Sequence, residues 1–207
     1  MVNPKSITTI AAPQQIDKRK NAKYRAIDAA ESCFIEMGVV KTSMEDVAKK
    51  AEMARSTLYR YFKDKDQLIM AVLEREAESI AHYVGERISR YSDIRAYFIE
   101  GILLAVNTIE SNQLLIKLFL EDSNTSISRI ILTSDRLQVI GIQTMREIIE
   151  PARSSGFLRD DISEEKIMDW LLRIVFSILT TPSEFTSSDE KKRELLNDML
   201  LPVIIKN

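Results

Sequence analysis

The sequence of 207 residues contains one cysteine and one histidine. Cys33 therefore has no partner for a disulfide within the chain, and His82 has no second histidine with which to hold a zinc ion. Most metalloenzyme chemistry is excluded, and we expect neither a metal nor a cofactor. We expect Cys33 to pack in a core, with redox sensing as its alternative. For His82 we expect a structural or surface role, with a pH-dependent or ligand contact as the alternative.

Residues that break helices are also scarce. The chain has five glycines and five prolines, and no proline occurs between Pro13 and Pro151. This scarcity favours helices throughout. Hydrophobic residues make up 45% of the chain and charged residues 29%, a composition that argues against disorder of the whole chain.

No uncharged apolar run reaches the roughly 18 residues that a membrane-spanning helix needs, and the first residues do not have a signal-peptide pattern. We therefore expect a soluble cytoplasmic protein without membrane contact. The sequence also has no glycine-rich phosphate loop, no nucleophile elbow and no histidine beside a serine. These absences argue against an enzyme.

Charge is distributed unevenly. Residues 1–75 contain 14 lysines and arginines and 10 acidic residues, whereas residues 76–207 contain 15 and 21. A basic front suits contact with a polyanion, although a chance fluctuation would give the same difference. Residues 1–20 are predicted to form a flexible N-terminal arm, which either lies against DNA or is a solvated tail.

Apolar spacing predicts about nine helices and no strands. The first helix spans about Asn21 to Met37, and Gly38 follows where a left-handed residue would end it. A capping box of Thr42 and Glu45 predicts a second, short helix from about Ser43.

Further helices follow from similar signals. A third short helix covers Arg55–Phe62, and Asp64 with Gln67 marks the start of a long fourth one. Pro151 should kink a later helix that ends near Gly156. Other starts are expected near Ser92, Ser111, Ser126, Ser163 and Ser187, the last in a capping box with Glu190.

The segment Ser43–Phe62 has the anatomy of a helix-turn-helix. Small Ala48 lets two helices cross closely, and Val47 and Leu58 help to close their shared core. The second helix offers many side chains that suit phosphates and base edges: Arg55, Ser56, Thr57, Tyr59, Arg60 and Tyr61. Spacing alone leaves DNA binding and an ordinary helical bundle as alternatives.

The residues from about Ala26 to Ala71 also resemble the tetracycline-repressor-like (TetR) transcriptional regulators. The resemblance rests on the stretch Gly38–Ala51 and on the Leu-Tyr-x-Tyr-Phe-x-x-Lys string of Leu58–Lys65, directly after the helix-turn-helix. It implies an all-α fold with a three-helix DNA-binding domain at residues 21–67. A larger helical bundle at residues 68–207 would bind an effector and form a homodimer.

The resemblance implies roles at matching positions. Thr42 and Ser43 would contact phosphates at a helix N-terminus, and Met44 would at most touch a thymine methyl group. Four residues would hold the DNA backbone: Thr57, Tyr59, Tyr61 and Lys65. Three would read bases: Arg55, Ser56 and Arg60.

One position departs from the family, which usually has glycine after the second helix where this chain has Glu52. A residue other than glycine in a left-handed turn costs about 1–2 kcal/mol. Either the turn is strained here or it is wider.

The stretch from Ile167 to Leu179 is apolar on nearly every side, so it must be buried on two faces. One face would pack on its own domain, and the other would meet a second copy together with a stripe on the last helix. The predicted interface comprises Trp170, Leu171, Ile174, Val175, Ile178, Leu196, Met199, Leu200 and Val203. A helix that is simply central to its own domain is the alternative.

The middle helices supply apolar side chains that either line a cavity or form plain core. By analogy with the family, we expect a small, largely apolar effector, still unidentified, because few charged residues interrupt these helices. The predicted contacts are Tyr97, Phe98, Ile102, Phe119, Ile142, Met145 and Ile149.

These features predict a dimeric repressor that a ligand releases from a palindromic DNA operator. One alternative is a family member that activates transcription, or acts structurally on DNA, without a small ligand. Another is a helical module that binds a ligand or a protein and has lost DNA binding.

Overall fold

The computed structural model describes residues 22–118 and 131–206, apart from the side chains of residues 147 and 148. Within these ranges the chain forms ten α-helices and one short 3-10 helix, and its only β-type pairing is an isolated bridge between Leu158 and Ile205. The all-α prediction is confirmed. The predicted arm at residues 1–20, the helix start at Ser126 and the ligand contact Phe119 lie outside the described residues.

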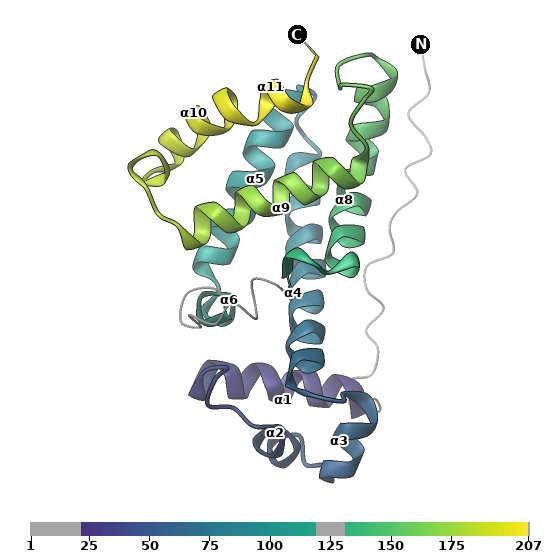
Figure 1. The fold of residues 1–207 in the computed structure, drawn as a ribbon, viewed down its shortest axis with the longest axis vertical. Coiled ribbons are helices and arrows are strands. Elements are labelled where there is room, and N and C mark those ends of the chain that lie inside the picture. The colour runs from purple at the N-terminus through teal and green to yellow at the C-terminus, as the bar shows by residue number, and fades with distance from the viewer. Residues whose placement is uncertain (1–21, 119–130, 207) are drawn as a thin grey trace.

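Three helices form one end of the molecule, at the bottom of Figure 1: α1 (Ala22–Met37) and the two short helices α2 (Met44–Lys50) and α3 (Arg55–Tyr61). Phe34 and Leu58 are completely buried between them. As predicted, α1 ends at Gly38, which has a φ of 80° and donates its N–H to the carbonyl of Phe34 at 3.0 Å. The capping box of α2 lies one residue later than predicted, because Ser43 and Asp46 form it.

The long helix α4 (Lys65–Ile88) joins this end to the body. Its N-cap is Asp64, which accepts from the Gln67 N–H at 2.8 Å, as predicted. The helix packs against α1 and continues into the body, so it runs without a break through the predicted domain boundary at residues 67 and 68. A shift of the body can therefore be transmitted to α1, α2 and α3 through one continuous helix.

The body is a bundle around the second half of α4, with α9 crossing in front of α4 and α5 in Figure 1. Its elements are α5 (Ile94–Ser111), α6 (Gln113–Ile116), α8 (Asp135–Ser154), α9 (Glu164–Thr180), η2 (Glu184–Thr186), α10 (Asp189–Met199) and α11 (Leu201–Ile204). α8 continues through Pro151 to Ser154, and Gly156 follows with a φ of 79°. In the described ranges, none of the helices has the length and apolar character needed to cross a bilayer.

Several predicted helix starts are shifted by one residue, at places where two polar residues are adjacent in the sequence. Ser163 caps α9 as expected, but Asp93 rather than Ser92 caps α5, and Asn112 rather than Ser111 caps α6. α10 likewise starts after Ser188 instead of Ser187, so the predicted box with Glu190 is wrong. The side chain that reaches a free N–H of the first turn decides the cap, and adjacent polar residues compete for that place.

Candidate nucleic-acid interface and ligand cavity

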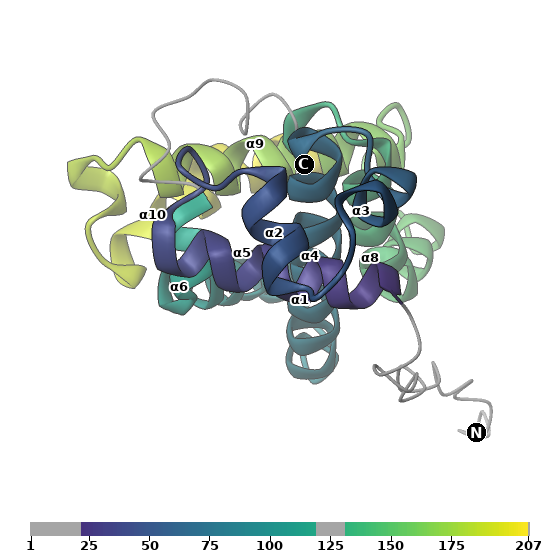
Figure 2. The same cartoon turned by 90° about the horizontal axis from the view of Figure 1, so that it is seen from below.

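Helix α3 presents almost its whole surface to solvent. Its single buried residue is Leu58, which faces α1 and α2. Thr57 is partly buried, and five further residues of α3 are exposed: Arg55, Ser56, Tyr59, Arg60 and Tyr61. Figure 2 shows α2 and α3 at this end of the molecule. Because only Leu58 is buried, a dense set of hydrogen-bond donors, the side chains predicted to contact DNA, lies on the exposed surface.

The two arginines of α3 differ in their surroundings. The Arg55 guanidinium lies 3.4 Å from the Glu45 carboxylate of α2 and 5.5 Å from the centre of the Tyr59 ring. Tyr59 first, and then Glu45, raise the pKa of Arg55, which stays charged. Arg60 lies 5.3 Å from the centre of the Tyr61 ring. Arg55 therefore has an anionic partner within the chain, which the predicted contact with DNA would have to displace.

Two predicted DNA contacts lie inside the domain instead. The Thr42 side chain is buried, and its hydroxyl donates to the carbonyls of Gly38 at 2.8 Å and Cys33 at 3.3 Å. Met44 is also buried, on the inner face of α2. Their predicted roles as side-chain contacts are wrong, because the turn before α2 directs both side chains into the core. Ser43 is exposed and accepts from the Asp46 N–H at 3.2 Å.

Cys33 and His82 have the roles expected of isolated residues. Cys33 is buried in the core, and burial raises the pKa of its thiol, so the reactive thiolate is disfavoured. His82 is exposed on α4, 3.6 Å from Glu86 one turn later.

Lys65, predicted to hold a phosphate, holds the turn before α2. Its ammonium group donates to the carbonyls of Val39 at 2.9 Å, Thr42 at 3.2 Å and Val40 at 3.3 Å. An ammonium group has three donors, and all three are used within the chain. Lys65 is therefore a structural cation in this conformation, a role that sequence reasoning missed.

Substituting Lys65 with methionine is expected to lower the free energy of unfolding by about 1–3 kcal/mol, because the carbonyls of the turn lose a charged donor. A urea melt followed by circular dichroism measures this change. Lys63→Met is the matched control: Lys63 is exposed, and its substitution should change stability by less than about 0.5 kcal/mol. Equal melting of both variants would show that the three hydrogen bonds contribute nothing.

Glu52 stands in a strained left-handed turn, with a φ of 51°. Its N–H donates to the Lys49 carbonyl at 3.1 Å, and the Met53 N–H donates to the Ala48 carbonyl at 3.0 Å. This is the Schellman arrangement, in which glycine usually takes the left-handed place. Of the two possibilities that the sequence left open, the strained turn is confirmed and the wider turn is excluded.

The Glu52→Gly variant is expected to be more stable than the wild type by about 1 kcal/mol, since glycine adopts this φ without steric cost. Chemical denaturation of the full chain measures the gain. Glu52→Ala is the control, because it removes the carboxylate but retains a Cβ atom, and it should give no comparable gain. A gain in the alanine variant would assign the effect to charge instead of strain.

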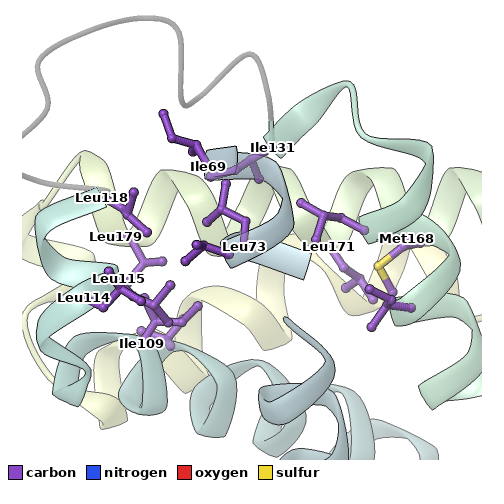
Figure 3. Close-up of a cluster of buried hydrophobic side chains, with 14 of the residues drawn as sticks. Ile69, Leu73, Ile109, Leu114, Leu115, Leu118, Ile131, Met168, Leu171 and Leu179 are labelled. Carbon is purple, nitrogen blue, oxygen red and sulfur yellow. The ribbon is translucent and has the colours of Figure 1, made fainter. Parts of the chain in front are cut away.

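The body contains a cavity of about 220 Å³, lined mainly by α4, α5, α8 and α9. Figure 3 shows part of its lining, including Leu73 of α4, Leu115 of α6 and Leu171 of α9. Four of the predicted ligand contacts line it: Tyr97, Phe98, Ile102 and Met145. Ile142 and Ile149 do not, because they pack into the surrounding core. Of the two alternatives left by the sequence, a cavity lining and plain core, the first applies to Tyr97, Phe98, Ile102 and Met145, and the second to Ile142 and Ile149.

Sequence reasoning missed the contribution of α4 to this cavity. Leu73, Glu76, Ala77 and Ile80 all line it, at spacings of three and one and three. These positions share one face of a helix, so helical periodicity carried the signal. Glu76 is a charged residue on an otherwise apolar face.

The residues of the predicted dimer interface divide into three groups by exposure. Trp170, Met199 and Val203 are exposed, by 44%, 67% and 41%. Ile174 and Val175 are partly buried against the core, and Val175 also lines the cavity. Four further residues are buried within their own chain: Leu171, Ile178, Leu196 and Leu200. The interface role predicted for these four is wrong, because α9 packs against both α5 and α8 and α10 packs against α5.

Comparison with known proteins gives matches of two kinds. Residues 26–72 match the family model of bacterial regulatory proteins, tetR family. The HTH-type transcriptional regulator Rv1255c of Mycobacterium tuberculosis is 23% identical over 188 residues, which cover 88% of this chain and 85% of that protein.

Solved structures share the fold over most of the chain. The structure of RolR in complex with resorcinol has a TM-score of 0.67 at 18% identity and covers 90% of this chain and 89% of that one. The repressor AlkX from a Dietzia strain, implicated in the biodegradation of n-alkanes, has a TM-score of 0.61 at 22% identity, with coverage of 89% and 95%. At these identities the likeness establishes the fold.

Proposed function

We propose that this chain, a member of the TetR family of bacterial regulatory proteins, acts as a dimeric repressor that a small ligand releases from a palindromic operator. As a member of that family it is a transcription regulator and not an enzyme. The observation that carries this proposal is that one helix, α4, starts directly after α3 with its exposed face and also lines the apolar cavity. A ligand that alters the position of α4 would alter the position of α3 relative to DNA.

In this proposal Ser43, which precedes α2, and residues of α3 make the contacts with DNA. Arg60 and Arg55, with Ser56, read base edges in the major groove. The hydroxyl groups of Ser43, Thr57, Tyr59 and Tyr61 hold phosphates and set the register. Lys65 acts indirectly, by fixing the turn that leads into α2.

A dimer follows from the geometry of DNA, since two recognition helices one helical turn apart require two symmetry-related copies. We name Trp170, Met199 and Val203 the outer patch. Its residues come from α9, α10 and α11, which lie away from α2 and α3 in Figure 1. All three side chains are large and apolar yet exposed in the single chain, and exposed tryptophan, methionine and aliphatic side chains are typical of an interface core. We therefore assign the outer patch to the dimer.

The test is fluorescence anisotropy with the duplex from upstream of the protein's own gene, at two salt concentrations. We expect specific binding about 1,000-fold or more tighter than binding to a scrambled duplex of equal composition, and an affinity that falls as salt rises. Titration at concentrations well above the dissociation constant should give two chains per duplex. Equal affinity for both duplexes at both salt concentrations would contradict specific DNA reading at this site.

A further inference from the structure

The cavity has one acidic or basic group among its described lining residues, the carboxyl group of Glu76. This side chain is about half-way along α4 and is partly buried. Burial raises the pKa of Glu76, and the nearby Glu31 carboxylate raises it further. A carboxylate in apolar surroundings is stabilised by a cation or by hydrogen-bond donors.

The other polar side chains of the lining are committed to the protein. The Tyr97 hydroxyl donates to the Thr144 carbonyl at 3.4 Å, and the Thr144 hydroxyl donates to the Ile140 carbonyl at 2.9 Å. Glu76 accepts from the Asn112 side chain at 2.8 Å, and a carboxylate has acceptor sites for further donors. Glu76 is thus the group best able to orient a ligand.

Glu76 also belongs to a cluster with an excess of negative charge. Arg75, the next residue of α4, pairs with Asp28 and Glu31 of α1. One guanidinium therefore pairs with two carboxylates, those of Asp28 and Glu31, and the Glu76 carboxylate lies close enough to be affected by the charges of Arg75 and Glu31. A further anion would be repelled here, whereas one positive charge would compensate part of the excess.

We propose that the cavity binds a monocationic amine with an apolar body, whose ammonium group contacts the Glu76 carboxylate. This assignment rests on the proposed ligand-binding function and specifies the ligand's chemistry. The apolar lining holds the body of the ligand by the hydrophobic effect, and the single carboxylate selects the sign of its head group. Asp28 and Glu31 of α1 pair with Arg75 of α4, so the ammonium group would sit beside the ion pairs that hold α1 to α4.

Isothermal titration calorimetry of the full chain with three matched probes tests the assignment. The probes are 4-phenylbutylamine, 4-phenylbutanol and 4-phenylbutyrate, which share one apolar body and carry a positive, a neutral and a negative head group. The amine should bind the wild type about tenfold more tightly than the alcohol, and the acid should bind most weakly.

The Glu76→Gln variant keeps the size of the side chain and removes its charge. It should bind the amine about tenfold more weakly than the wild type and the alcohol within about twofold, which also shows that the cavity is intact. Glu78→Gln is the matched control, because Glu78 lies on the exposed side of α4 against Arg136, and it should bind all three probes as the wild type does.

Three results would overturn the assignment: binding of the alcohol or the acid as tightly as the amine, an amine preference that survives in Glu76→Gln, or no heat with any probe. The anisotropy assay with and without the amine separates this assignment from the proposed function. Binding of the amine that depends on Glu76 but leaves operator affinity unchanged would keep the ligand assignment and contradict release by this ligand. If the amine is not preferred and the alcohol releases the protein from the operator, the ligand assignment is contradicted and the proposed release by a small ligand is kept.

Discussion

Replacing Arg60 with alanine is expected to lower operator affinity by about a hundredfold while leaving the scrambled duplex nearly unaffected. An arginine that takes a base edge contributes about 1–3 kcal/mol of discrimination, and a dimer loses that contact in both half-sites. The guanidinium of Arg60 is exposed and stacks near Tyr61, so we expect no loss of stability beyond about 0.5 kcal/mol.

Arg60 is the stronger of the two arginine tests because Arg55 is paired with Glu45 in the free protein. DNA must displace that carboxylate before Arg55 can bind a base, so part of the gain is offset. Arg55→Ala should therefore cost less affinity than Arg60→Ala does.

Anisotropy titration of wild type, Arg60→Ala and Arg136→Ala provides the measurement. Arg136 is an exposed arginine on α8 that pairs with Glu78, so it matches Arg60 in chemistry but lies outside α1–α3. Its substitution should leave operator affinity within about twofold of the wild type, as surface substitutions usually do. An equal loss of binding to operator and scrambled duplex in Arg60→Ala would assign Arg60 to a phosphate and not to a base.

The Trp170→Asp substitution is expected to convert the dimer to a monomer at micromolar concentration. A central aromatic residue of an interface commonly contributes 2 kcal/mol or more, and a two-fold interface contains it twice, so the dimer dissociation constant should rise about a thousandfold. The introduced carboxylate adds a desolvation cost. Because the wild-type indole is 44% exposed in the single chain, the monomer itself should remain folded.

Sedimentation velocity gives the mass directly, and circular dichroism verifies the fold. Phe185→Asp is the matched control, since Phe185 is 66% exposed on η2 and lies outside the outer patch. That variant should remain dimeric. Operator affinity of Trp170→Asp should fall with dimer affinity, because a single recognition helix contacts only one half-site. A Trp170→Asp protein that remains dimeric would move the interface to another face.

The sequence by itself determined the features that depend on residues within about one helical turn. The helical period placed Leu58 inward on α3, and that one position left the arginines and tyrosines of α3 exposed. Gly38 ended α1 because only glycine adopts a positive φ without strain, and Asp64 began α4 because its carboxylate reaches the Gln67 N–H. The string Leu58–Lys65 carried the resemblance to the TetR family, and residues 26–72, which include it, match the model of that family.

Only the tertiary structure decided which helical faces are covered and where long polar side chains end. Leu171 and Leu200 look like interface residues in sequence, but neighbouring helices cover them. Lys65 is a surface cation by sequence, yet its ammonium group reaches three carbonyls more than 20 residues away. The position of Glu76 in the cavity lining, and the effect of Glu31 of α1 on its pKa, follow only from the tertiary structure. Such contacts join distant parts of the chain, and local periodicity carries no information about which distant residues meet.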